Sequence, residues 1–149
     1  DNICCEEQSE LIYKGDPMQD SFIWLPADKW DGLIRIGGNQ FGDFGQPDFF
    51  FAEVLFIEIP PRKGPIQLSQ FNTEDVAVRY SHFFEDYGGD GYSVDTTKVN
   101  NLEVICIDTV SQMISVAFDL HFVRDDDPSY PFVKEVSFTD GLFCGVYAN

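Results

Sequence analysis

Basic residues are scarce in this chain of 149 residues. It has 9 lysines and arginines against 26 aspartates and glutamates, which gives a net charge of −17 at pH 7 and a pI of about 4.1. Nucleic-acid binding needs a basic patch that neutralises phosphates, and electrostatic docking to anionic lipid needs basic clusters. The charge therefore excludes nucleic acid as a partner and argues against binding to a membrane surface by charge.

Long apolar runs are also missing. The sequence has no stretch of about 18 apolar residues, so we expect no membrane-spanning helix. The chain does not open with a basic segment, an apolar stretch and a small-residue cleavage site, which together mark a secretory signal. We therefore expect either a cytosolic protein or a mature form whose signal has been removed.

The motifs of common catalytic sites do not occur. The two histidines, His82 and His121, are too few for a three-histidine metal centre, and neither H-E-x-x-H nor G-x-S-x-G is present. His121 would share a strand face with Asp119, but no nucleophile can be assigned to this pair, and a surface histidine near carboxylates is the alternative. A pair of carboxylates could indicate a glycoside hydrolase, but among 26 acidic residues some pair always lies at a suitable distance, so this gives no evidence for such an enzyme. We therefore expect a protein that is not an enzyme.

Large apolar side chains are plentiful, with 15 phenylalanines, 6 tyrosines and 2 tryptophans. Disorder is common in chains this acidic, but so many aromatic groups would not be left in water. A length of about 150 residues predicts one domain, which can bury roughly 68–70% of its unfolded surface.

Apolar residues recur with a spacing close to two, which is the period of a half-buried β-strand. The clearest strand is expected at 114–122. The other expected strands are 33–36, 49–59, 66–68, 76–80, 102–107, 136–138 and 142–147. This pattern predicts an all-β fold, either an antiparallel β-sandwich or a partly open barrel of about eight strands, formed by residues 21–149. Residues 1–20 are expected to be a polar leader, linker or edge segment, and single helical turns are expected at 28–30 or 72–75.

One hairpin can be placed in register from the sequence. Setting Leu120 opposite Val136 on the inner face puts His121 opposite Glu135 on the outer face. A slip of one residue would move every side chain to the other face. We therefore predict that His121 and Glu135 are cross-strand neighbours.

The four cysteines are Cys4, Cys5, Cys106 and Cys144, and the sequence does not choose among their three full pairings. A Cys4–Cys5 bridge would be a strained vicinal pair. A bridge from either of them to Cys144 would tie the leader to the last strand, and the long loop that it closes would be worth roughly a few kcal/mol. Alternatively, Cys106 and Cys144 are small buried apolar residues. Zinc is not expected, because no C-x-x-C occurs.

The aromatic residues suggest a candidate ligand surface. Trp24 and Trp30 flank the segment 25–29, and Phe49, Phe50 and Phe51 are consecutive, so part of this run would point away from a one-sided core. Exposed rings of this kind could stack on sugars or bind a partner protein. Burial of the rings in a core covered on both faces is the alternative.

A second candidate is a calcium site formed by Asp86, Asp90 and Asp95 in a glycine-rich segment. The segment does not match an EF-hand loop, because Gly88 and Thr97 stand where acidic ligands are needed. A different calcium site would still need several carboxylate oxygens from these aspartates. The alternative is a solvated Gly/Asp turn between strands.

The second half of the chain carries a series of strand motifs in a characteristic order. They are LEVICID at 102–108, ISVAFDL at 114–120 and VSFTDGLF at 136–143. This order resembles the small secreted lipoproteins of unknown function common in Bacteroidetes, over about residues 50–149. One departure is Val116, where these proteins tend to have glycine.

The resemblance implies an all-β domain that faces the periplasm or cell surface and is held at the outer membrane by an N-terminal lipid. Since a lipid-bearing cysteine follows a small residue and Ile3 precedes Cys4, the lipid would be on a cysteine before Asp1. The expected function is a non-enzymatic cell-envelope domain with a structural or binding role, with an envelope protein or glycan as its partner. The alternative is a glycan- or peptide-binding module that uses the exposed aromatic residues.

Overall fold

The computed structural model describes residues 4–5, 9–14, 23–42, 51–84, 91–125 and 133–148. Its elements are β1 (Glu10–Lys14), β2 (Ile23–Trp24), β3 (Ala27–Trp30), β4 (Leu33–Gly42), β5 (Phe51–Ile59), β6 (Gly64–Pro65), the 3₁₀ turn η1 (Leu68–Gln70), β7 (Ala77–Phe84), β8 (Tyr92–Val94), β9 (Asn101–Asp108), β10 (Met113–Arg124) and β11 (Glu135–Ala148). The described residues are thus almost entirely strands and turns.

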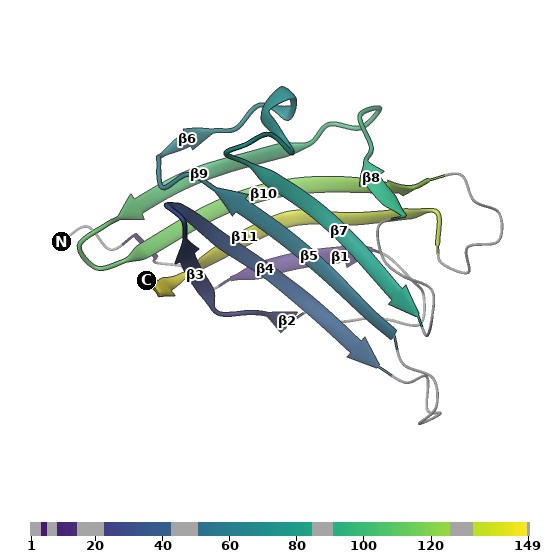
Figure 1. The fold of residues 1–149 in the computed structure, drawn as a ribbon, viewed down its shortest axis with the longest axis horizontal. Coiled ribbons are helices and arrows are strands. Elements are labelled where there is room, and N and C mark those ends of the chain that lie inside the picture. Colours follow the sequence, from purple (N-terminus) through teal and green to yellow (C-terminus); the bar gives the residue numbers. More distant parts are fainter. Residues whose placement is uncertain are drawn as a thin grey trace.

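The strands form one curled sheet in the order β6-β9-β10-β11-β3-β4-β5-β7, with β1 beside β11, β2 beside β4 and β8 beside β10. The sheet is mixed, because β11 and β3 pair in parallel through Tyr147–Ala27 and Ala148–Asp28, whereas its other pairs are antiparallel. In Figure 1 the long strands β9, β10 and β11 cross β4, β5 and β7, so the sheet curls into a half-barrel. The predicted all-β fold is confirmed, in a form close to the partly open barrel.

The core lies between the two arms of this sheet. Apolar side chains at every second position point inward from both arms, as the period of two predicts. From β4, β5 and β7 they are Ile34, Ile36, Leu55, Ile57, Ile59, Val78 and Tyr80, and from β9, β10 and β11 they are Leu102, Val104, Ile114, Val116, Phe118, Leu120, Phe122, Val136, Phe138 and Phe143. One continuous cluster therefore holds the two arms together.

Residues 28–30, expected as a helical turn, belong to strand β3. The reason is the two-residue turn Asp31–Gly32, in which both residues have positive φ, 52° and 81°. Such a turn matches the twist of a hairpin and joins β3 to β4. It sets Asp28 opposite Arg35.

The prediction of a strand at 66–68 is also wrong, because the only strand residues in this described part of the chain are Gly64–Pro65 of β6. The main chain at Ile66 donates one hydrogen bond to Leu102, and the chain then turns through η1. The Gln67 N–H donates to the Gln70 side chain at 2.8 Å as part of a capping box at the start of this turn, and the Phe71 N–H donates to the Leu68 carbonyl at its end. The helical turn thus lies at Leu68–Gln70, a few residues before the predicted position at 72–75.

The predicted register of the last hairpin is wrong by two residues. His121 lies opposite Ser137, and Glu135 lies opposite Val123. The difference is already present beside the connection of the two strands, where the Arg124 N–H donates to the Lys134 carbonyl at 2.7 Å. A bulge in β11 near Thr139–Gly141 then shifts the pairing with β10 by one further residue, and the pairing with β1 also changes register there. At the bulge Asp140 has a φ of 50°, and its extra N–H donates to Asp119 Oδ1 at 2.9 Å. His121 and Glu135 remain on the same face, because the shift is an even number of residues.

At the bulge, Gly141 packs closely against the Phe118 ring, so a larger residue at this position is expected to overpack the core. A Cβ added to Gly141 would lie 2.5 Å from Cε2 of Phe118, a ring that is 2% exposed and cannot move aside. Gly141→Ala is therefore expected to lower the free energy of unfolding by about 1–3 kcal/mol, as overpacking does. Urea unfolding measures this. Gly145→Ala is the control, because its Cβ would lie 3.2 Å from the tip of Phe143; an equal loss in both variants would contradict the prediction.

The N-terminal segment, expected as a leader or edge segment, joins the sheet. Strand β1 pairs with β11, and the two cysteines before it form disulfides with later strands, Cys4 with Cys106 and Cys5 with Cys144. All four cysteines are therefore used, and the vicinal bridge is not formed. The two bridges bind the start of the chain to β9 and β11.

Candidate functional site

The two candidate tryptophans do not form one surface. Trp24 lies opposite Gly38 and Trp30 opposite Leu33, and these β4 positions are an odd number of residues apart, so the two rings are on opposite faces. Trp24 is half-buried and packs edge-on against Phe118 and Phe143, with ring centroids 5.8 Å and 5.3 Å away. Trp30 is 64% exposed.

The other aromatic candidates are not placed. Phe49 and Phe50 lie outside the described residues, and Phe51 begins β5 without a described side chain. The aromatic surface expected from the sequence therefore reduces to Trp30 in the part of the chain that the structure describes.

Trp30 is engaged by its neighbours on the β3–β4 hairpin. The Arg35 guanidinium lies 5.4 Å from the Trp30 ring centroid and donates two hydrogen bonds to Asp28, at 2.8 Å and 2.5 Å. The hydrogen bond from Arg35 holds the pKa of Asp28 below its usual value. This exposed group of three stabilises the hairpin and has the geometry of a cation–π and ion-pair contact rather than a ligand pocket.

The candidate calcium ligands are not brought together. Asp86 and Asp90 lie outside the described residues. Asp95 Oδ1 accepts hydrogen bonds from the Thr97 hydroxyl at 2.6 Å and from the Thr97 N–H at 3.0 Å, and the hydroxyl bond is the main cause of its lowered pKa. Among the described residues, no three His, Cys, Asp or Glu side chains are grouped as metal ligands. Asp95 thus stabilises the turn after β8 through its hydrogen bonds to Thr97.

His121 has a hydroxyl partner that the sequence did not indicate. Its Nδ1 lies 2.8 Å from Ser137 Oγ across β10 and β11. A serine nucleophile also needs an oxyanion hole and a cleft for its substrate. Neither residue lines the pocket between β7, β8 and β10 or the trough beside β1, so the pair has the geometry of a cross-strand contact.

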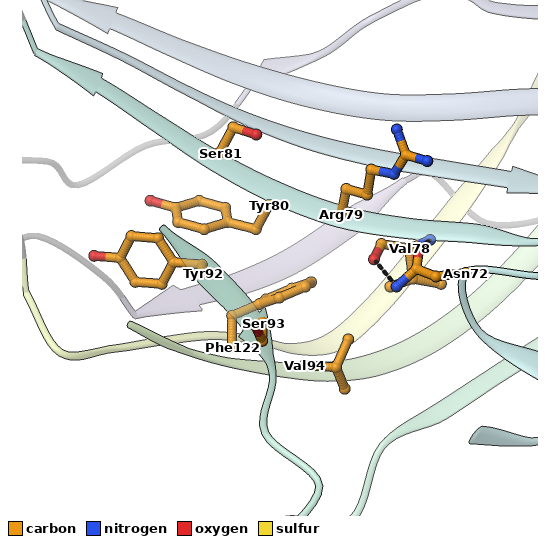
Figure 2. Close-up of a pocket in the computed structure, with 9 residues that line it drawn as sticks. All are labelled: Asn72, Val78, Arg79, Tyr80, Ser81, Tyr92, Ser93, Val94 and Phe122. Carbon is orange, nitrogen blue, oxygen red and sulfur yellow. Dashed lines mark hydrogen bonds between the residues drawn. The ribbon is translucent and has the colours of Figure 1, made fainter. Parts of the chain in front are cut away.

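A pocket lies at the seam of the half-barrel, between β7 on one side and β8 and β10 on the other. Its volume is about 260 Å³, and the lining residues are Asn72, Val78, Arg79, Tyr80, Ser81, Tyr92, Ser93, Val94 and Phe122. We call it the seam pocket. Figure 2 shows the Tyr80 and Tyr92 rings next to each other, while Arg79 extends away from them.

The floor of the seam pocket is rigid. Tyr80 contacts Tyr92 edge-on at 4.9 Å and Phe122 at 5.6 Å between ring centroids, and all three rings are buried. The Tyr92 hydroxyl donates to the carbonyl of Val133. The rim is polar, because Arg79 and Ser93 are exposed. This combination of a preformed floor and a few polar groups is typical of a small-molecule site.

The rim is also held in place at Asn72. Its side chain bonds the main chain of Val78 twice, accepting from the N–H at 3.0 Å and donating to the carbonyl at 3.1 Å (Figure 2). This pair of bonds imitates a neighbouring β-strand and shields that point of the β7 edge.

A buried polar cluster lies behind Tyr80. Glu53 on β5 and His82 on β7 are directly opposite in register, both are 0% exposed, and His82 Nδ1 is 3.9 Å from Glu53 Oε1. The Tyr80 hydroxyl donates a hydrogen bond to the same Glu53 oxygen. Sequence reasoning missed this cluster, although the signal was present: Glu53 falls on the inward positions shared with Leu55 and Ile57.

Comparisons of the chain with models of protein families, with curated proteins and with solved structures find no match. In the part of the chain that the structure describes, no helix has the length and apolar character needed to cross a membrane. The function must therefore be argued from the pockets and the chemistry of the side chains around them.

Proposed function

We propose that this chain is a non-enzymatic binding domain of the cell envelope that takes a short glycan in the seam pocket. The observation that carries this proposal is the pocket itself, a space of about 260 Å³ with a buried aromatic floor and a polar rim. The Ser93 hydroxyl on the rim donates to Asp125 at 2.9 Å, so its oxygen remains an acceptor for the hydroxyl groups of a sugar, and the exposed Arg79 adds charge-assisted donors at the edge.

Binding is favoured over catalysis by the position of the titratable groups. Glu53 and His82 are an acid and a base behind the floor, and both are 0% exposed. The Tyr80 ring separates them from the pocket, because Tyr80 lines the pocket and also bonds Glu53. A general acid or base must reach the reacting atom within hydrogen-bond distance, directly or through one water.

The two disulfides support a location in an oxidising compartment, because such bridges form and persist there and are rare in the cytosol. In this proposal the domain faces the periplasm or cell surface and is anchored at the outer membrane through a lipid on a cysteine before Asp1. The net charge of −17 keeps it soluble by repulsion. The precursor sequence tests the anchor: a signal that does not end in a cysteine overturns it.

The seam pocket can be tested by filling it. Short oligosaccharides chosen on a glycan array are titrated calorimetrically into the wild type and into Ser93→Trp, whose indole would occupy the pocket. We expect Ser93→Trp to weaken binding by about tenfold or more, which is about 1.4 kcal/mol or more. Ser69→Trp is the matched control, because Ser69 is exposed on η1 and does not line the pocket.

Two outcomes would contradict the proposal. One is an array on which no glycan binds. The other is equal glycan affinity in the wild type, in Ser93→Trp and in Ser69→Trp, which would place the bound sugar elsewhere on the domain.

A further inference from the structure

The four cysteines are gathered around one row of the sheet. Ser115 on β10 lies opposite Cys106 on β9 and opposite Cys144 on β11, so the three residues stand side by side. Cys4 is bonded to Cys106 and Cys5 to Cys144, with Cα–Cα distances of 5.5 Å and 5.4 Å. The Cys4–Cys5 dipeptide therefore crosses over β10 at Ser115, which is only 6% exposed.

Beyond the bridges, the N-terminal strap, defined as Cys4, Cys5 and residues 9–14, is held by hydrogen bonds. The Ser9 hydroxyl accepts from the Cys144 N–H at 2.9 Å and donates to the Cys144 carbonyl at 3.2 Å, and β1 pairs with β11. The strap is thus bound covalently at one end and by the Ser9 hydrogen bonds and strand pairing along the rest.

We propose that this group of cysteines is a thiol–disulfide exchange site at which one two-electron reduction by a small dithiol opens both bridges. The Cys5–Cys144 bridge reacts first, because both of its residues are half-buried, whereas Cys4 is 8% exposed. A thiolate of the dithiol attacks Cys144 Sγ and expels the Cys5 thiolate. The second thiol of the reductant then displaces Cys144 as a thiol, and the reductant leaves as a cyclic disulfide.

The second bridge opens without further reductant. The Cys5 thiolate, next in sequence to Cys4, attacks Cys4 Sγ, forms a Cys4–Cys5 bond and expels the Cys106 thiolate, which takes up a proton. The protein thereby gains two thiols and keeps one disulfide, and the dithiol loses two electrons and two protons. The Cys4–Cys5 bond is a strained vicinal bridge, and the effective concentration of the linked Cys5 thiolate, in the millimolar range or above, offsets that strain.

Opening both bridges would free the strap from β9 and leave it held to β11 by hydrogen bonds alone. The strap forms one wall of an open trough of about 630 Å³, to which it contributes Glu10 and Ile12, while Ala117, Asp119 and Leu142 line the other side. Reduction at the cysteines is therefore coupled to the shape of this trough and to the exposure of Ser115.

Thiol mapping tests the order of these steps. The intact chain is treated with one equivalent of dithiothreitol, quenched with acid, alkylated and digested without reduction for mass spectrometry. We expect Cys106 and Cys144 to be alkylated together, with the Cys4–Cys5 peptide unalkylated and lighter by two hydrogens. Alkylation of Cys5 with Cys144 would show simple stepwise reduction, and alkylation of Cys4 with Cys144 would show attack on Cys106; either result overturns the proposal.

A rate measurement uses a variant that retains only the Cys4–Cys106 bridge. In Cys5→Ser/Cys144→Ser no internal thiolate is available, so at about 0.1 mM dithiol the release of Cys106 is expected to be about tenfold slower than in the wild type. In the wild type, the conversion that follows release of Cys144 is expected to be independent of dithiol concentration. A rate proportional to dithiol in the wild type overturns the proposal even if the variant fails to fold.

Discussion

Replacing Cys4 and Cys106 with alanine is expected to lower the free energy of unfolding by about 4 kcal/mol in the chain-entropy account of disulfides. The bridge spans 102 residues, but the relevant loop is shorter because Cys5–Cys144 remains closed. With that bridge in place, the Cys4–Cys106 bond closes a ring of roughly 40 residues, which runs from Cys106 to Cys144 and back through the Cys4–Cys5 peptide. Urea unfolding under non-reducing conditions measures the loss.

The same reasoning makes a second, less obvious prediction for the other bridge. When Cys4–Cys106 remains, the Cys5–Cys144 bond closes the same ring of roughly 40 residues. Removing it in Cys5→Ala/Cys144→Ala is therefore expected to cost the same as the first variant within about 1 kcal/mol. Strongly unequal costs would show that native-state contacts of one bridge, rather than entropy of the unfolded chain, dominate. Removing all four cysteines is expected to cost roughly 8–9 kcal/mol, which is most of the stability of a typical domain.

Replacing Glu53 with alanine is the second change with a large expected effect. Glu53 and His82 are both fully buried, and the Tyr80 hydroxyl bonds the Glu53 carboxyl group. Removal of one partner of a buried pair leaves the other desolvated, which typically costs about 3–5 kcal/mol. We therefore expect Glu53→Ala to lower the free energy of unfolding by that amount, measured by urea denaturation.

Two further variants identify the cause of that loss. Glu58→Ala, on the same strand but half-buried and outward, is expected to change stability by about 0.5 kcal/mol or less. The apolar replacement Glu53→Met/His82→Leu/Tyr80→Phe removes the whole cluster and is expected to recover most of the loss, because well-packed apolar groups often match a buried pair. A triple variant less stable than Glu53→Ala would show that the cluster itself stabilises the fold.

The strands were predictable because their cause is local. The alternation from Ile114 to Phe122 marks one buried face, and the structure places a long strand there. The register of the same strand was not predictable to the residue, since it is set where the Arg124 N–H meets the Lys134 carbonyl of the next strand. It then shifts again at the bulge, where Asp119 accepts the extra N–H of Asp140. No pattern within either strand carries that contact.

In the candidate sites, too, features with a local cause were predictable and contacts between distant strands were not. Trp30 is exposed, as the ligand-surface alternative required, but Trp24 packs on Phe118, a residue far from it in sequence. The seam pocket and the buried Glu53–His82 pair were missed because their residues come from different strands that meet only after the sheet curls.

The sequence by itself determined the class of the fold and the charge of the surface, because strand period, turn residues and net charge are properties of short segments and of composition. Only the tertiary structure decided the disulfide pairing, the bulge and the seam pocket. Each of these depends on how strands far apart in the chain are placed relative to one another, and many placements bury the same apolar faces equally well. The choice among them follows from contacts such as Ser115 between two bridged cysteines, which exist only once the chain has folded.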